Sequence, residues 1–124
     1  MQQVYGIDDD LLHWASLAFP GGIGGCQDVC GAVAGGAMAL GGSFSRKGKD
    51  WREVYEDLRR AVGDFYRDFE QEFGTAECRA LTGYDFSQPE ERQKFRDDAE
   101  ARRRCRSYVE YAVRKLTERE AKGE

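Results

Sequence analysis

Nine of the chain's fifteen glycines fall between residues 21 and 42, and Cys26 and Cys30 lie in the same stretch. A glycine inside a helix costs about 1 kcal/mol relative to alanine, so a glycine-rich helix needs a compensating gain. Close approach by another backbone or by a cofactor is the usual gain. The segment therefore predicts a closely packed helix from about residue 26 to residue 40. Three small residues are expected where a neighbouring helix comes closest: Gly31, Gly35 and Ala39.

The rest of the chain has the apolar spacing of helices and no useful strand alternation. Acidic residues at positions 8–10 predict the start of a short first helix, which Pro20 stops. Asp50 as the N-cap, a long apolar stripe and Gly74 as the stop predict a third helix. After a connector over residues 75–88, a last helix is expected from about residue 90 to residue 116.

These patterns predict an all-α fold, a compact bundle of four to five helices. A single domain is expected over residues 1–124, with an ordered core over about residues 5–117. The third and last helices are expected to pack lengthwise along their aromatic and aliphatic stripes.

Composition narrows the classes of function. The net charge of −4 argues against a general nucleic-acid binder. No apolar run approaches the roughly 18 residues of a membrane span. The N-terminus has no basic region before its first apolar stretch, so a cytoplasmic protein is expected, although a chain whose signal had been removed would look the same. Reducing conditions there disfavour structural disulfides, which leaves metal binding or redox cycling as uses for grouped cysteines.

The four cysteines are the candidate functional residues. Cys26 and Cys30 are four positions apart, so on one helix both would project from the same face near its N-terminus. The positive end of the helix dipole would favour their thiolates, and the amides of Gly24 and Gly25 could donate hydrogen bonds to sulfur. Two further cysteines have arginine neighbours that lower a thiol pKa: Cys78 beside Arg79, and Cys105 within the run Arg102 to Arg106.

Spacing alone leaves three interpretations open: a shared redox or metal site, inert buried thiols, or a disulfide. A C-x3-C pair is a weak signal, and free cysteine is often buried as a small hydrophobe. His13 is the only histidine, which excludes a zinc site with two histidines. His13 itself is expected at a helix surface rather than on a metal.

A family resemblance runs from about residue 5 to residue 116. The glycine loop at residues 21–25, followed by residues 29–38, resembles the signature of the C_GCAxxG_C_C family of redox-active proteins. The stretches around Cys78 and Cys105 resemble the third and fourth conserved cysteines of that family. The family's first cysteine normally lies on a helix before the glycine loop. Here no cysteine precedes Cys26, so either the sequence starts late or Cys26 takes that role.

The resemblance implies a shared cysteine site in which Cys30, Cys78 and Cys105 converge, with Cys26 as the fourth member. Four cysteines suit an iron–sulfur cluster acting in electron transfer or redox sensing, with zinc as the alternative metal. Gly24, Gly25, Gly31 and Arg79 are expected to support the site.

Two other functions stay open. The first is a thiol–disulfide redox protein, for which Cys30 with Cys78 or Cys105 is the better pair. The second is a structural or assembly module with inert cysteines. The expected partners are a second copy of the chain, through a face that includes Trp14 and Phe19, and a redox partner protein.

Overall fold

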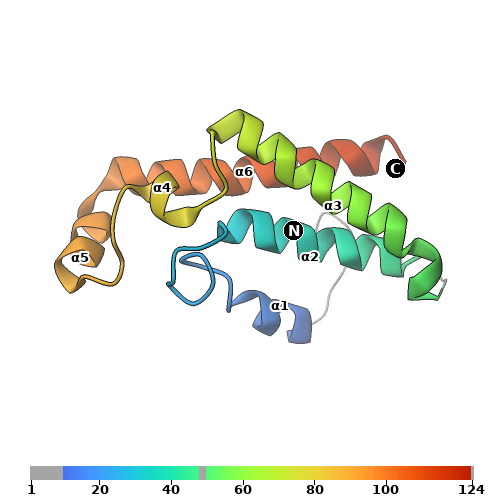
Figure 1. The fold of residues 1–124 in the computed structure, drawn as a ribbon, viewed down its shortest axis with the longest axis horizontal. Helices are drawn as coiled ribbons and strands as arrows, with labels where there is room; N and C mark the ends of the chain where they lie inside the picture. The colour runs from blue at the N-terminus through green and yellow to red at the C-terminus, as the bar shows by residue number, and fades with distance from the viewer. Residues whose placement is uncertain (1–9, 48–49, 124) are drawn as a thin grey trace.

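The computed structural model describes residues 10–47 and 50–123, and this part of the chain is helical (Figure 1). Its six helices are α1 (Asp10–Ser16), α2 (Gly31–Ser45), α3 (Trp51–Phe73), α4 (Cys78–Thr82), α5 (Pro89–Asp97) and α6 (Ala99–Ala121). The all-α prediction is confirmed for the described residues, but the expected count of four to five helices is too low. The expected helix-starting acids at positions 8 and 9 lie outside the described residues, as does the start of the expected core.

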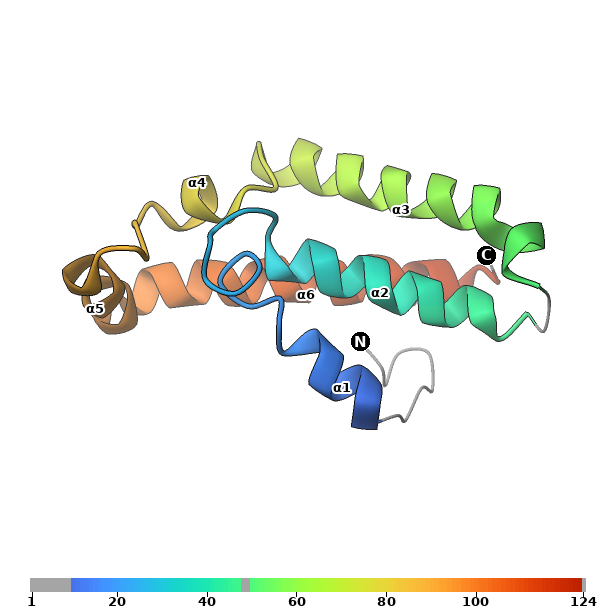
Figure 2. The same ribbon diagram turned by 60° about the horizontal axis from the view of Figure 1, so that its bottom comes forward.

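α2 is the central helix of the bundle, and it packs against both α3 and α6. Figure 2 shows α3 along one side of α2, with α1 on the side away from α3. The shorter helices α4 and α5 lie at the end of the bundle where α2 begins (Figures 1 and 2). The expected contact between the aromatic stripes of the third and last helices is present, where Phe69 and Phe73 of α3 meet Tyr108 and Tyr111 of α6. The helix against which α3 packs most extensively is nevertheless α2.

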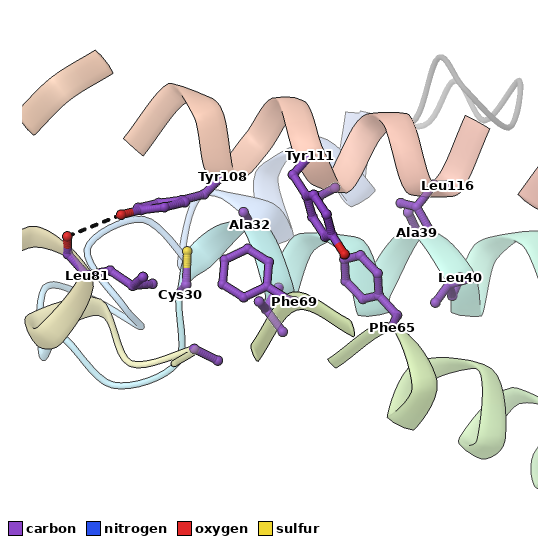
Figure 3. Packing of buried hydrophobic residues seen from close by; sticks show 13 residues of the cluster. Cys30, Ala32, Ala39, Leu40, Phe65, Phe69, Leu81, Tyr108, Tyr111 and Leu116 are labelled. Atoms are coloured by element: carbon purple, nitrogen blue, oxygen red, sulfur yellow. Dashed lines mark hydrogen bonds between the residues drawn. The ribbon is translucent and has the colours of Figure 1, made fainter. Parts of the chain in front are cut away.

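The helix α3 forms where its end signals predict it. The carboxylate of Asp50 accepts a hydrogen bond of 2.9 Å from the amide of Arg52, and Gly74 ends the helix with a left-handed φ of 86°. Its buried residues, Ala61, Phe65 and Phe69, share one face. Figure 3 shows Phe65 and Phe69 in the core between α2 and α6. Packing in this core holds α2 in place, and with it the N-terminal end of α2.

One glycine of α2 makes the close helix contact, but it is not one of the expected glycines. A Cβ atom built on Gly36 would lie 2.5 Å from ring carbons of Phe65 on α3, whereas one built on Gly35 would meet nothing within 4 Å. Gly31 lies against the backbone of Phe19 rather than against a helix, and Ala39 is buried in the core. The prediction at Gly35 is wrong by one position, because the face buried against α3 includes Gly36.

Alanine at these two adjacent glycines is expected to shift stability in opposite directions. Gly36→Ala should lower the free energy of unfolding by about 2 kcal/mol, because its methyl group overlaps the Phe65 ring. Gly35→Ala should raise it by up to about 1 kcal/mol, since the helix gains alanine without a clash. Urea unfolding followed by circular dichroism measures both. Equal effects of the two substitutions would contradict the assignment of the contact.

The expected last helix is two helices that meet at Asp98, where φ is −92° and ψ is 95°. The Asp98 carboxylate accepts hydrogen bonds from the amide of Ala101 (3.0 Å) and from the hydroxyl of Tyr84 (2.6 Å). The first bond caps α6, and the second joins Asp98, the residue between α5 and α6, to the connector that follows α4. The interruption therefore depends on a partner 14 positions away, which local periodicity does not reveal.

None of the helices among residues 10–47 and 50–123 combines the length and apolarity needed to cross a membrane.

Candidate redox site

Two loops that are distant in the chain meet where α2 and α4 begin. An isolated antiparallel bridge joins Val29 to Glu77. On either side of it, the amide of Cys30 donates to the carbonyl of Ala76, and the amide of Cys78 donates to the carbonyl of Asp28, both at 2.7 Å. Cys30 is the N-cap of α2, and Cys78 is the first residue of α4. The bridge therefore brings these two cysteines close together from helices separated by the whole of α3.

The glycine loop before the bridge winds through left-handed backbone conformations. The residues with φ between 58° and 80° are Gly21, Gly22, Ile23, Gly24, Gly25 and Gln27. Backbone bonds from Gln27 to Gly21 (2.8 Å) and from Asp28 to Gly22 (2.9 Å) close the loop, which Figure 2 shows as a closed turn. Such a backbone cannot continue an α-helix. The expected helix start near residue 26 is therefore wrong, and Cys26 and Cys30 do not share a helix face.

Gln27 is a central polar residue of the site that the sequence analysis missed. Its side chain is buried, and its amide nitrogen donates to the Thr82 hydroxyl (3.1 Å) and to the carbonyl of Tyr84 (2.8 Å). Its oxygen accepts from the amide of Phe86 at 2.7 Å. Gln27 thus fastens the glycine loop to the segment after α4. No local signal marks it, because its partners lie 55 to 59 positions away.

Three of the four cysteines line one apolar pocket of about 400 Å³. Cys30 and Cys78 are buried and Cys105 is partly buried, whereas Cys26 is exposed on the glycine loop and does not line the pocket. The sulfur of Cys30 points toward α6, the helix that carries Tyr108 (Figure 3). The pocket is in the size range of small-molecule sites. The remaining walls are mainly aromatic and aliphatic, from Phe19, Pro20, Phe86, Phe95, Tyr108 and Val109.

Burial keeps these three thiols protonated at neutral pH. It raises the pKa of Cys30, although the amides of Ala32 and Val33 lower it by hydrogen bonding to sulfur. Burial, followed by the charges of Cys30 and Cys105, raises the pKa of Cys78 to about 11, against a smaller lowering by the Gln27 side chain. Burial and the Cys30 charge also raise the pKa of Cys105, against a lowering by Arg104.

At this site desolvation therefore raises the thiol pKa values by more than the neighbouring arginines and backbone amides lower them. Arg79 was expected to favour the Cys78 thiolate, but its guanidinium bonds Asp85 at 3.3 Å and does not line the pocket. Gly24 and Gly25 belong to the left-handed loop, and Gly31 packs against the backbone of Phe19. These glycines shape the loop that holds Cys30 and Cys78.

The raised pKa of Cys78 predicts a stability that falls in alkaline solution. A thiol whose pKa is higher in the folded state stabilises the fold below its ordinary pKa near 9, and this contribution is lost as the pH rises through about 11. Urea unfolding at intervals from pH 8 to pH 11, in reducing buffer, should give a shallower decline for Cys78→Ser than for the wild type. Cys26→Ser, at the exposed thiol, is the control and should follow the wild type. Identical curves for the two variants would contradict the prediction.

The cysteines of this site are not arranged as a metal centre. Among the described residues, no group of three or more histidine, cysteine, aspartate or glutamate side chains is placed to hold a metal ion. An iron–sulfur cluster commonly takes four cysteines, and here Cys26 lies outside the pocket of the other three. A four-cysteine cluster therefore does not fit this arrangement. His13 is exposed on α1 and does not line the pocket.

Comparison with known proteins gives one assignment. Neither the curated proteins nor the solved structures yielded a match. A sequence family described as "Putative redox-active protein (C_GCAxxG_C_C)" matches residues 1–119, which is almost the whole chain. The glycine loop, Cys30, Cys78 and Cys105 all lie within the matched range. The chain belongs to the C_GCAxxG_C_C family.

Proposed function

We propose that this protein carries out reversible thiol–disulfide redox chemistry, with Cys30 and Cys78 as the pair that forms the disulfide. The single observation that carries the proposal is the placement of both cysteines beside the Val29–Glu77 bridge, on the wall of one pocket. Membership in a family of redox-active proteins supports the same class of chemistry.

Cys30 is the better nucleophile of the pair. Only a thiolate attacks, and the amides of Ala32 and Val33 at the start of α2 stabilise the Cys30 thiolate. Burial, followed by the charges of Cys30 and Cys105, raises the pKa of Cys78 to about 11, and only the Gln27 side chain lowers it. Cys30 therefore attacks first, and Cys78 resolves the mixed disulfide.

The reaction balances with an organic disulfide as the acceptor. Cys30 loses its proton and attacks one sulfur of the acceptor, which releases one thiol and leaves a mixed disulfide. Cys78 then loses its proton and attacks the Cys30 sulfur, which releases the second thiol. The protein loses two electrons and two protons, one S–S bond forms in the protein and one is broken in the acceptor.

Equilibration in glutathione redox buffers tests this proposal. Oxidised wild-type protein should lose two thiols, and peptide mass spectrometry should find Cys30 joined to Cys78, with full recovery on reduction. Cys26→Ser should behave as the wild type, because that cysteine lies outside the pocket. Cys30→Ser should lose the two-thiol step. A Cys30–Cys105 disulfide in the wild type, or no reversible loss of two thiols, would overturn the assignment of the pair.

A metal centre at Cys30, Cys78 and Cys105 is the second candidate, and it requires these side chains to move from their present positions, which do not form a metal site. In its favour, the charge of the Cys30 thiolate adds to burial in raising the pKa of both Cys78 and Cys105, a repulsion that a bound cation would remove. Metal and sulfide analysis with visible absorption of anaerobically purified protein distinguishes the candidates. Iron with matching sulfide, or one equivalent of zinc, retained by Cys26→Ser and lost in Cys30→Ser, would favour the metal centre over the disulfide.

Self-association is a separate proposal, and the first helix is its candidate surface. Trp14 and Leu17 on and after α1 are 71% and 53% exposed, and exposed apolar residues that cluster often mark contact surfaces. Phe19, which was also expected on this face, is instead half-buried and lines the pocket of the three cysteines. Light scattering at micromolar concentration should give the mass of a dimer or larger assembly for the wild type and a lower mass for Trp14→Glu. A monomeric wild type would rule this out. An oligomer that persists in a variant lacking all four cysteines, together with no thiol cycling and no metal, would favour the structural module.

A further inference from the structure

A second pocket adjoins the apolar pocket lined by Cys30, Cys78 and Cys105, which we call the thiol pocket, and differs from it in chemistry. It has a volume of about 510 Å³ and lies between the glycine loop and α5, where Arg92 and Arg96 line it. We call it the arginine pocket. Its wall shares four residues with that of the thiol pocket: Pro20, Gly21, Phe86 and Phe95. The two pockets are therefore neighbours with a common wall.

The charges of the arginine pocket are available to a ligand. Arg92 and Arg96 are one turn apart on α5, so both project toward the same side of the helix. Seven arginines elsewhere in the described residues form ion pairs with carboxylates, and these two are not among them. Arg96 donates only to the neutral amide oxygen of Gln93, at 2.9 Å. No carboxylate is among the described residues that line this pocket.

The thiol pocket has the opposite character, since none of the described side chains that line it is charged. A charged group buried there would lose its hydration without gaining a partner. Aromatic rings form much of its wall, and the rings of Phe86 and Phe95 at the boundary pack with centroids 5.0 Å apart. Flat aromatic molecules interact favourably with such rings. The wall therefore suits an uncharged aromatic body next to the thiols.

The glycine loop leaves open space in the arginine pocket. Gly24 and Gly25 line the arginine pocket, and a Cβ atom on either would stand in open space. A side chain at these positions would project into the space that a ligand needs. The loop thus presents only backbone to the arginine pocket at these two residues.

From these contrasts we propose that the two pockets bind one aromatic quinone that carries an acidic substituent. The ring lies in the thiol pocket, and the acidic group lies against Arg92 and Arg96. This rests on the proposed function, in which Cys30 and Cys78 supply the electrons. The two thiols give two electrons and two protons to the quinone, one S–S bond forms in the protein, and the quinone becomes a hydroquinone.

Binding is tested first, without redox chemistry, in a Cys30→Ser/Cys78→Ser background. The probes are anthraquinone-2-sulfonate and its uncharged analogue 2-(hydroxymethyl)anthraquinone, measured by equilibrium dialysis. Arg92→Gln/Arg96→Gln should weaken binding of the sulfonate about tenfold and leave binding of the uncharged probe within twofold. The control is Arg102→Gln/Arg106→Gln, which removes the same charge from exposed positions one turn apart on α6 and should change neither constant.

A second pair of variants tests the place of the ring. Gly35 lines the thiol pocket with open space beside it, so Gly35→Leu should fill part of the pocket and weaken binding of both probes about tenfold. Gly41→Leu is the matched control on the same helix, because its position is also open but does not line the pocket. Equal effects of the two arginine pairs, or of the two glycine variants, would overturn the proposed binding site.

Electron transfer is tested separately with the wild type under anaerobic conditions. Reduced protein mixed with anthraquinone-2-sulfonate, and oxidised protein mixed with its hydroquinone, should reach the same mixture with two thiols exchanged per hydroquinone. Binding without exchange from either side would overturn the quinone as the acceptor. Failure of the Cys30–Cys78 disulfide to form in glutathione buffer would instead overturn the proposed function, so the two failures are distinguishable.

Discussion

Replacing Gly22 with alanine is expected to lower the free energy of unfolding by about 3 kcal/mol and to disrupt the thiol pocket. Gly22 has a φ of 70°, which a residue with a side chain adopts only with strain of about 1 kcal/mol. A Cβ atom there would also lie 2.7 Å from the amide nitrogen of Asp28 and from Cβ of Cys78. Because backbone cannot yield as a flexible side chain can, the bridge that places Cys30 and Cys78 must shift. Urea unfolding and the rate of thiol alkylation at pH 8 measure the two effects.

Gly25→Ala is the control that separates strain from collision. Gly25 has a similar φ of 80°, but a Cβ atom there meets nothing within 4 Å. It should therefore cost only about 1 kcal/mol and leave the alkylation rate of the buried thiols near that of the wild type. If Gly22→Ala and Gly25→Ala cost the same, the close packing of the glycine loop on Cys78 plays no part in holding the site.

Phe69→Ala is expected to lower the free energy of unfolding by about 4 kcal/mol, in the range for removal of a buried aromatic ring. Phe69 is fully buried, with 0% of its surface exposed. Its ring packs against Tyr108 and Tyr111 of α6, with centroids 5.9 Å and 5.8 Å away. The substitution therefore leaves a cavity at the point where α3 and α6 touch. Thermal and urea unfolding measure the loss.

Tyr66→Ala, on the same helix, removes an aromatic ring that is 37% exposed and should cost about 1 kcal/mol. The comparison distinguishes loss of core packing from loss of an aromatic residue in α3. A cost for Phe69→Ala below about 2 kcal/mol would mean that the two helices do not depend on this ring cluster.

The sequence predicted the long helix α3 well, because its signals are local. The capping residue Asp50, the stop at Gly74 and the stripe that includes Phe65 and Phe69 all lie within the helix or directly at its ends. The same reasoning placed the α2 start wrongly, since the glycine run allows both a helix and a left-handed loop. What decides between them is the pairing of Val29 with Glu77, which lies 48 positions away.

The candidate site shows the same division between local and distant causes. The resemblance to a family pointed to the cysteines that line the pocket, Cys30, Cys78 and Cys105, and the chain's own spacing did not separate them from Cys26. The backbone of Gln27, with a φ of 58°, turns the chain between Cys26 and Cys30. A glutamine at that φ is uncommon, and it is held there by its side-chain bonds to residues 82–86 together with backbone bonds to Gly21 and Arg79. The raised thiol pKa values likewise follow from burial, which charge counting along the chain does not reveal.

The bonds from Cys30 to Ala76 and from Cys78 to Asp28 join the same two loops. Both amides belong to the cysteines themselves, so a fluctuation that separates the two loops releases both bonds and uncovers both thiols together. Native-state hydrogen exchange should therefore show the Cys30 and Cys78 amides exchanging as one unit, with a lower opening free energy than the amides around Phe69 in the core. A thiol reagent too large to enter the pocket would reach Cys30 and Cys78 only after that same opening. The rate of this local opening would then limit the rate at which both thiols react with it.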